Sequence, residues 1–433
     1  MRSGNAAQHE RILKVFERFV ASAHDAGLVR MRVDDDVLEG DSITLDGHKL
    51  TNFGSCAYSG LNTDARLKRA AIEAIERFGP VFSSSTAYTS VDLYTRLERL
   101  LEQMFDASVV VPTTTTLGHL SCLPLVAGPG STVLIDAQAH SSVHLATQVV
   151  KSTGIDVTPL PHNDEAALEA AVSDACRTND QVWYVADGVY SMLGDVAPVE
   201  TIARLLEEHP NLWVYVDDAH GVGWAGKHGR GVVLERMDLH PRMIVAASLA
   251  KSIGAGGAVL VFHDATLAAR VQIAAGPMTF SGPLHPAELG AAVAAVEIML
   301  SDEQPEMKRR IDEQIRLVGR LGRELGLPFG AFDHTPVWFA RIGKHDDAVE
   351  VGRRMIESGY FLNLASFPAV PLGHSGLRFT HTLFHDQDQI ESMLRTLATH
   401  ILDVVGERVI DLTDEAIDHP TAPFDLLETL PED

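Results

Sequence analysis

The sequence predicts an α/β fold with a mainly parallel central sheet, helices on both faces of that sheet and a smaller C-terminal α/β domain. Two observations predict this class. From Thr51 to about Pro283, short β-branched runs alternate with longer helical stretches, and such alternation is typical of a parallel sheet. Most of these runs are apolar throughout, as expected for strands buried on both faces. Ligands of such sheets bind at the carboxyl ends of the strands.

The first part of the chain divides into an N-terminal arm and a large domain. Apolar spacing predicts a helix over residues 8–26, and we assign residues 1–50 to the N-terminal helix and arm. We assign residues 51–290 to a large domain. Its strands are expected at Ser108–Val111, Thr132–Ile135, Asp156–Pro159, Gln181–Val185, Leu212–Val216, Met243–Ala247 and Ala258–Phe262.

The second part of the chain predicts a small domain and a tail. A long charged helix, Glu303–Gly326, is expected to link the large domain to the small domain, which we assign to residues 291–405. Residues 406–433 are rich in Asp and Glu, and we expect a solvated acidic tail there. Within the small domain we expect strands at Val337–Ile342, Phe361–Leu364 and Leu377–Thr380, and helices near 346–358 and 386–402.

Composition excludes several classes of protein. Of the 433 residues, 45% are apolar and 22% are charged, the balance of a folded soluble chain. The formal charge of −24 argues against a nucleic-acid-binding surface. No run approaches the length of a membrane span, and the N-terminus lacks the apolar run of a signal peptide. The three scattered cysteines, Cys56, Cys122 and Cys176, form no disulfide framework, so we expect a cytoplasmic protein.

The strongest local motif is SLAKSIGAGGA, residues 248–258, which places Lys251 in a glycine-rich segment just after a predicted strand. Glycine lets backbone approach a ligand closely. A lysine in a crowded apolar pocket has a lowered pKa and becomes a nucleophilic amine. A surface lysine in a flexible loop is the alternative, and this motif alone does not exclude it.

The second motif is YVDDAHGVGWAG, residues 215–226, in which an apolar run delivers Asp217 and Asp218 to a strand end. Two adjacent acids there could bind a metal or cap a helix. A carboxylate is also what a pyridinium cofactor needs behind its ring nitrogen, because it keeps that nitrogen protonated. His220 would then reach the ring hydroxyl or position the acid. The separation of Asp217 from Lys251 leaves room for one loop, helix and strand, so both should arrive from neighbouring strand ends.

In order and separation, these motifs resemble those of pyridoxal-phosphate (PLP) enzymes of fold type I, and within them the α-oxoamine synthase family. That family includes 8-amino-7-oxononanoate synthase, 5-aminolevulinate synthase, serine palmitoyltransferase and 2-amino-3-ketobutyrate CoA ligase. The resemblance extends from about Asn52 to about Ile401 and implies an aspartate-aminotransferase-like fold. Further matching segments are DGVYSMLGD from Asp187, DAQAHSS around His140 and GLRFTHTLFH around Arg378.

The resemblance implies a role for each matching residue. Lys251 would bind PLP covalently and act as the base at the substrate Cα, and Asp217 would charge the pyridine nitrogen. His140 would stack on the ring, and Arg378 would bind the substrate carboxylate; a satisfied histidine and a structural salt bridge are the respective alternatives. The cofactor phosphate should sit at a helix N-terminus after Val111. The expected cofactor-binding residues are Lys251, Asp217, His220, His140, Ser191, Ser248, Thr114, Thr115 and Ser281, the last reaching the phosphate of the neighbouring subunit in a homodimer.

Three departures from the family pattern lie on the substrate side. Ala57 stands where the family has a substrate-binding asparagine, and Ser85 where it has an arginine. A run of threonines from Thr113 replaces the usual phosphate-loop sequence. The cofactor chemistry is therefore better supported than the identity of the substrate, and we expect a specialised branch with an unusual amino acid or acyl donor.

The resemblance implies decarboxylative Claisen condensation of an amino acid with an acyl thioester, either acyl-CoA or acyl carrier protein. The products would be an α-amino ketone, CO2 and the free thiol. Transamination, retro-Claisen cleavage and racemisation use the same cofactor and stay open as alternatives. A binding-only protein has no need of the lysine nucleophile. A hydrolase with a metal at Asp217, Asp218 and His220 lacks a further cluster of ligands with suitable spacing.

Overall fold

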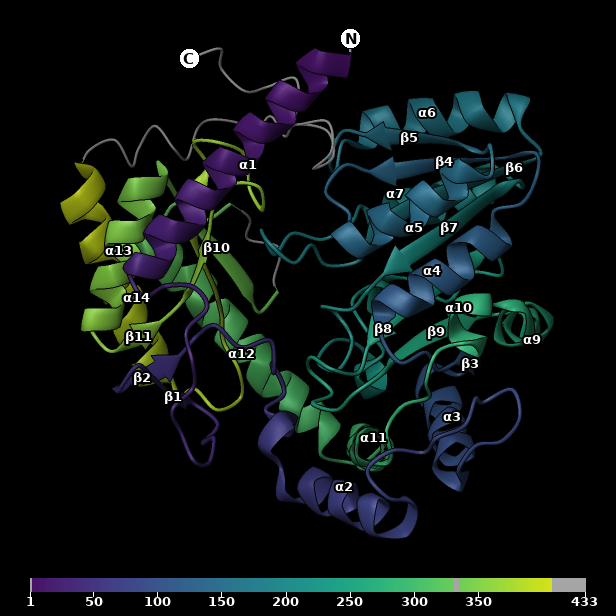
Figure 1. Ribbon diagram of the computed structural model, residues 1–433, viewed down its shortest axis with the longest axis horizontal. Coiled ribbons are helices and arrows are strands. Elements are labelled where there is room, and N and C mark those ends of the chain that lie inside the picture. The colour runs from purple at the N-terminus through teal and green to yellow at the C-terminus, as the bar shows by residue number, and fades with distance from the viewer. Residues whose placement is uncertain (1, 331–334, 407–433) are drawn as a thin grey trace. The chain divides into compact units, whose positions relative to one another are not determined.

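The structure, a computed structural model, describes residues 2–330 and 335–406 (Figure 1). The predicted acidic tail beyond Gly406 lies outside the described residues. The chain forms two compact units. Unit 1 contains the chain up to Cys56, Ser191–Asp195 and the chain from Ile311 onward, and unit 2 contains Ala57–Tyr190 and Val196–Arg310. The arm, large domain and small domain assigned from the sequence stay a prediction about how the chain is organised.

Unit 2 is built on a seven-stranded sheet in the order β3-β9-β8-β7-β6-β4-β5. The strands β8, β7, β6, β4 and β5 pair in parallel, whereas β9 is antiparallel to both β8 and β3. The predicted fold class is therefore confirmed, and each strand expected in this sheet is present. The strands are β3 Ser108–Val110, β4 Ser131–Asp136, β5 Asp156–Leu160, β6 Gln181–Asp187, β7 Leu212–Asp217, β8 Met243–Ser248 and β9 Ala258–Phe262.

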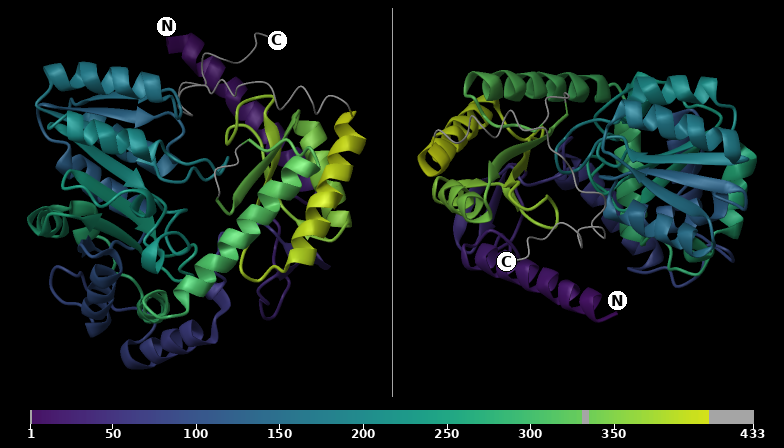
Figure 2. Two further views of the ribbon diagram at one scale, coloured as in Figure 1. Left: turned by 180° about the vertical axis from the view of Figure 1, so that it is seen from behind. Right: turned by 90° about the horizontal axis from the view of Figure 1, so that it is seen from above.

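Helices cover both faces of this sheet, as the top view in Figure 2 shows. Helices α4 and α5 pack together over one face, while α6 and α7 contact each other over the opposite face. The helices of unit 2 are η1 Leu61–Thr63, α2 Ala65–Phe78, α3 Asp92–Phe105, α4 Thr115–Val126, α5 Ser141–Ser152, α6 Glu165–Thr178, α7 Val199–Glu208, η2 Lys227–Gly229, α8 Val233–Arg236, α9 Ala265–Ala274, α10 Gly276–Thr279 and α11 Pro286–Met299.

The core between the sheet and the α4–α5 layer is formed by alternate residues of the central strands. Val133 and Ile135 of β4, Trp183 and Val185 of β6, and Tyr215 of β7 all belong to one buried cluster with Leu123 of α4 and Val143 of α5. Side chains two residues apart on a strand point to the same face. Asp217 therefore points toward the same helical layer as Tyr215, at the carboxyl edge of the sheet.

Unit 1 contains two three-stranded sheets, in the orders β1-β2-β11 and β10-β13-β12. The run Phe361–Leu364, predicted as one strand, is two strands: Tyr360–Phe361 pairs with β2, whereas Asn363–Ala365 pairs with β13. Helix α12, Gln304–Glu324, begins in unit 2 and continues into unit 1. The other elements of unit 1 are α1 Arg2–Asp25, β1 Ser42–Leu45, β2 His48–Asn52, β10 Val337–Gly343, α13 His345–Glu357, β11 Tyr360–Phe361, β12 Asn363–Ala365, β13 Ser375–Thr380 and α14 Gln387–Val405.

Candidate active site

The carboxyl ends of the parallel strands in unit 2 carry a cluster of acidic side chains. Asp136 ends β4, Asp187 ends β6 and Asp217 ends β7, and all three are buried. Asp187 and Asp217 face each other in the β6–β7 register. Lys251 follows the end of β8, which pairs in parallel with β7. The prediction that Asp217 and Lys251 arrive from neighbouring strand ends is therefore confirmed.

Asp217 has two hydrogen-bond donors and is only 5% exposed. The backbone N–H of Ala219 donates to Oδ1 at 3.1 Å, and Nε2 of His119 lies 3.0 Å from Oδ2. Burial acts to raise the pKa of this carboxyl. The charge and hydrogen bond of His119, followed by the charge of Lys251, outweigh burial and hold the pKa below its usual value. Asp217 is therefore an ionised carboxylate inside the protein.

His119 is a functional residue that the sequence motifs do not reveal. It lies on α4 and is fully buried, with Nδ1 2.8 Å from the hydroxyl of Tyr215 and Nε2 on Asp217. A lone histidine within an apolar helix carries no motif, and both of its partners come from a strand almost a hundred residues away. The only available signal is that a polar side chain on a buried helix requires a hydrogen-bond partner.

The pKa of Asp187 shifts in the opposite direction from that of Asp217, although both carboxyls are buried. Its carboxyl oxygens accept the backbone N–H of His140, at 3.0 and 3.1 Å. Burial, together with the negative charge of Asp217, raises the pKa of Asp187 well above its usual value. Through these two hydrogen bonds, Asp187 holds the loop that carries His140.

His140 caps the N-terminus of α5, and its Nδ1 lies 2.7 Å from the hydroxyl of Ser142. Burial lowers the pKa of its imidazole, while the charge of Asp217 acts in the opposite direction. The balance favours a neutral ring. A neutral, flat imidazole is suited to stacking on an aromatic cofactor.

His220 is held by a residue that lies far away in the sequence. Its Nδ1 is 2.7 Å from the hydroxyl of Tyr58, and both side chains are buried. The hydroxyl of the next residue, Ser59, donates to the backbone carbonyl of Ser252, next to Lys251. The segment that follows Ala57 therefore contacts both His220 and the loop that carries Lys251.

The loop of Lys251 depends on glycine. Gly254 has φ +75°, and a Cβ there would lie 2.5 Å from the backbone nitrogen of Asn62. No other residue fits without moving the neighbouring segment. Ser248, at the end of β8, accepts the backbone N–H of Ala250 at 3.1 Å. The lysine itself is partly exposed and therefore accessible to a ligand.

The predicted phosphate-binding helix begins where the sequence places it. Thr114 is the N-cap of α4, its hydroxyl accepts the N–H of Leu117 at 3.1 Å, and Thr115 is the first helical residue. The first N–H groups of a helix have no intrahelical partner and attract anions. Ser281 follows α10, and its hydroxyl donates to the carbonyl of Pro277 at 2.5 Å. The phosphate contacts of these side chains stay predictions.

In unit 1, Arg378 lies on β13 and is 8% exposed. Its Nε donates to the carbonyl of Ser191 at 2.5 Å, and its Nη2 lies 3.7 Å from Sγ of Cys56. These contacts orient a buried guanidinium. Ser191 therefore contributes its carbonyl to Arg378, and cofactor binding by its hydroxyl stays a prediction.

Asp218 has structural contacts within unit 2. Its Oδ2 accepts the N–H of Val233 at 3.1 Å, and burial raises the pKa of its carboxyl to about 8. A Cβ on Gly221 or Gly231 would lie 2.0 or 2.2 Å from its carboxyl oxygens, so the glycines make room for it. Within residues 2–330 and 335–406, no group of three or more His, Cys, Asp or Glu side chains is arranged to hold a metal ion.

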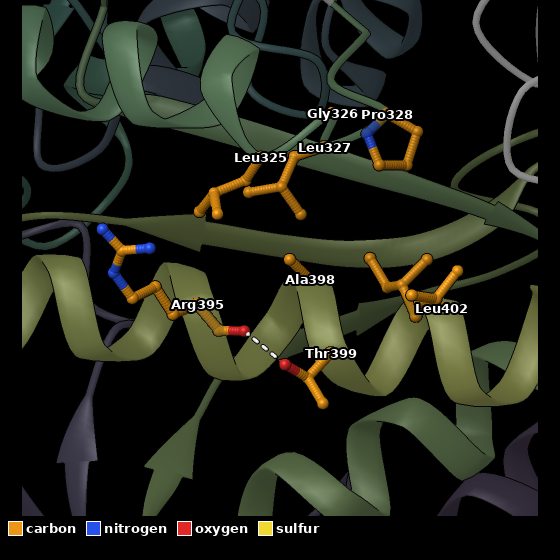
Figure 3. A pocket seen from close by; sticks show the side chains of 9 residues that line it. Leu325, Gly326, Leu327, Pro328, Arg395, Ala398, Thr399 and Leu402 are labelled. Carbon is orange, nitrogen blue, oxygen red and sulfur yellow. Dashed lines mark hydrogen bonds between the residues drawn. The ribbon is translucent and has the colours of Figure 1, made fainter.

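A separate cavity in unit 1, of about 430 Å³, lies between the end of α12 and α14 (Figure 3). Its one charged lining residue, Arg395, forms an ion pair with Glu391. None of the residues predicted for catalysis or cofactor binding lines it. The cavity is lined by Leu325, Gly326, Leu327, Pro328, Arg395, Ala398, Thr399, Ile401 and Leu402.

Comparison with known proteins agrees with this geometry. The family model "Aminotransferase class I and II" matches residues 48–397. An 8-amino-7-oxononanoate synthase of Maricaulis maris is 30% identical over 390 residues, covering 88% of this chain and 95% of the relative. The corresponding enzyme of Treponema denticola is 28% identical, with the same coverage. A serine palmitoyltransferase from S. paucimobilis, solved with bound PLP and myriocin, superposes with a TM-score of 0.81 at 23% identity, covering 91% of this chain and 99% of that one.

The chain belongs to the aminotransferase class I and II family, which uses pyridoxal phosphate on fold type I. Within that family it is a member of the α-oxoamine synthases, PLP-dependent acyltransferases that condense an amino acid with an acyl thioester. The donor set fits the cofactor, because an ionised buried carboxylate, an accessible lysine and a helix N-terminus match its ring nitrogen, aldehyde and phosphate. In the described part of the chain no helix is long and apolar enough to cross a membrane.

Proposed function

We propose that the chain joins the Cα of an amino acid to the acyl carbon of an acyl-CoA, with Lys251 and Asp217 as the central catalytic residues. The C–S bond of the thioester breaks, a C–C bond forms and the amino-acid carboxylate leaves as CO2. One proton is taken up, and the products are an α-amino ketone, CO2 and the free thiol. The observation that carries the proposal is the ionised, buried Asp217 beside the accessible Lys251 at one sheet edge.

Lys251 has two proposed tasks. Its amine would hold the cofactor at the aldehyde, and the same amine would accept the proton from the substrate Cα. When bound, the cofactor supplies an electron sink for the negative charge that this proton transfer leaves on Cα. Asp217 keeps a proton on the ring nitrogen, because its carboxylate stays charged within the protein.

The remaining contacts position the reactants. We assign ring stacking to His140, and we assign to His220, fixed by Tyr58, the ring hydroxyl. Thr114, Thr115 and Ser248 are assigned to the phosphate, with the first amides of α4. Arg378 is assigned to the substrate carboxylate, since a guanidinium pairs with a carboxylate through two parallel hydrogen bonds.

We further propose a homodimer that works in the cytoplasm. Unit 2 exposes large apolar side chains: Phe280 is 89% exposed, Tyr88 88% and Ile273 79%. Aromatic side chains such as those of Phe280 and Tyr88 are enriched at protein–protein interfaces. Phe280 directly precedes Ser281, which the dimer proposal assigns to the neighbouring subunit. The three cysteines are free thiols, which suits a reducing compartment.

A visible absorption titration tests the proposed function. The purified protein with PLP is titrated with single amino acids, and acyl-CoA is then added while free thiol is measured. We expect one amino acid to change the cofactor band and thiol release to require both substrates. Conversion of the cofactor to its amine form by the amino acid alone would indicate an aminotransferase instead, and Lys251→Ala should abolish both responses.

A further inference from the structure

The carboxylate of Asp217 receives a side-chain donor from helix α4, the imidazole of His119. It lies one helical turn after Thr115, on the face of α4 that packs against the sheet. It is 0% exposed and connects two side chains of β7, with Nε2 3.0 Å from Asp217 and Nδ1 2.8 Å from Tyr215. Because Tyr215 and Asp217 are two residues apart on the strand, one histidine reaches both.

We infer that His119 is a positioning residue that keeps Asp217 charged and aimed at the ring nitrogen of the cofactor, with Tyr215 fixing which imidazole nitrogen faces the carboxylate. The inference rests on the proposed role of Asp217 and extends it to a second layer of side chains. A buried carboxylate without a compensating donor becomes neutral. A neutral Asp217 would not hold a proton on the pyridine nitrogen.

The neighbouring strand supplies an internal comparison. Asp187 and Asp217 face each other across β6 and β7 and are 3% and 5% exposed. The pKa of Asp187 is raised by burial, whereas the pKa of Asp217 is lowered despite burial. Asp187 receives a backbone N–H from His140, but Asp217 also receives the imidazole of His119. The charge of Lys251 lowers the pKa of both acids, so the difference between them follows from the imidazole beside Asp217 and from the negative charge of Asp217, which raises the pKa of Asp187.

Tyr215 completes the arrangement. Burial raises the pKa of its phenol well above the usual value, so the hydroxyl keeps its proton. That O–H donates to Nδ1 of a neutral His119 and thereby leaves the N–H on Nε2, which faces Asp217. In the imidazolium form Nε2 carries a proton as well, and the phenol oxygen accepts from Nδ1. In both forms His119 donates to Asp217.

The test compares how apo-protein variants bind PLP and a PLP analogue in which carbon replaces the ring nitrogen, by equilibrium dialysis without substrate. The measured quantity is the ratio of the two dissociation constants, which isolates what the ring nitrogen contributes. We expect His119→Leu to reduce the preference for PLP about ten-fold, equivalent to about 1.4 kcal/mol. His119→Gln, which keeps a side-chain N–H, should restore part of it, and Tyr215→Phe should cause an intermediate loss.

His144→Leu is the matched control, because His144 is also a buried histidine of unit 2 but bonds to the carbonyl of Ala137. Its ratio should equal that of the wild type. An unchanged ratio in His119→Leu overturns the inference, as does an equal loss in His144→Leu. If His119→Leu does not fold, the inference stands on His119→Gln and Tyr215→Phe, and wild-type ratios in both overturn it. Because no substrate is present, failure of the condensation reaction would not alter this result.

Discussion

His385 allows a quantitative prediction about how the stability of unit 1 depends on pH. Its Nε2–H donates to the carbonyl of Asn52 at 3.1 Å, and its Nδ1 accepts the N–H of Thr382 at 3.0 Å. The ring also stacks on Phe53, with centroids 4.1 Å apart and an interplanar angle of 6°. Both nitrogens are thus used by the neutral ring. Protonation of Nδ1 would place a proton against a donor in a buried site.

The magnitude follows from linkage. Burial lowers the pKa of His385 to about 4 from 6.5. A lowered folded-state pKa contributes stability above pH 6.5, and this contribution is lost as the pH falls toward 4, because the unfolded chain binds the proton first. At 1.36 kcal/mol per pH unit, the loss is about 2 kcal/mol between pH 8 and pH 5. His381, whose pKa burial lowers to about 3, adds a similar amount.

Urea unfolding followed by circular dichroism at pH 8, 7, 6 and 5 measures this effect. His385→Gln should lower stability at pH 8 because it loses the ring stack on Phe53. Between pH 8 and pH 5, however, the variant should lose about 2 kcal/mol less than the wild type. The control is His48→Gln, at an exposed histidine of the same unit. Parallel pH profiles for the wild type and His385→Gln would refute the assignment of a neutral buried ring.

Three further predictions concern single side chains. Arg378→Ala should raise KM for the amino acid at least ten-fold while the cofactor absorption band persists, because its guanidinium is assigned to the substrate carboxylate. Steady-state kinetics measure KM and absorption spectra measure the band, and loss of the band would contradict the assignment. Gly231→Ala should lower the free energy of unfolding in urea by about 2–4 kcal/mol, since φ is +111° and the added Cβ would lie 2.2 Å from Asp218 Oδ2. Gly79→Ala, at φ +79° in open space, should lower it less. Asp386→Ala should cost about 1 kcal/mol in the same assay, because it removes the capping box that begins α14, and an unchanged midpoint would contradict that cap.

The sequence was sufficient to predict the central sheet and the arrival of Asp217 and Lys251 from neighbouring strand ends. Strands buried on both faces appear as continuous apolar runs, so each run of the large domain could be recognised locally. The separation of Asp217 from Lys251 could accommodate one crossover, and β7 and β8 are indeed neighbours. The run at 361–364 was assigned wrongly as one strand, because its two halves pair with different strands, β2 and β13, and β2 lies far away in the sequence.

The residues that support Asp217 and His220 from behind, His119 and Tyr58, could not be predicted in the same way. His119 reaches Asp217, and Tyr58 reaches His220, across most of a hundred residues or more. Neither contact leaves a spacing pattern, because helix α4 and the segment before η1 meet the strand ends only after folding. What the sequence does contain is a polar residue in a buried helix, and a buried polar group requires a partner.

The stoichiometry of CO2 and thiol tests the central claim most directly. An amino acid labelled in its carboxyl carbon, chosen from the absorption titration, is incubated with acyl-CoA and the PLP-loaded protein. We predict that labelled CO2 and free thiol appear in a one-to-one ratio, that each requires both substrates, and that Lys251→Ala releases neither. Thiol release without CO2, or CO2 release without acyl-CoA, would contradict decarboxylative condensation at this site.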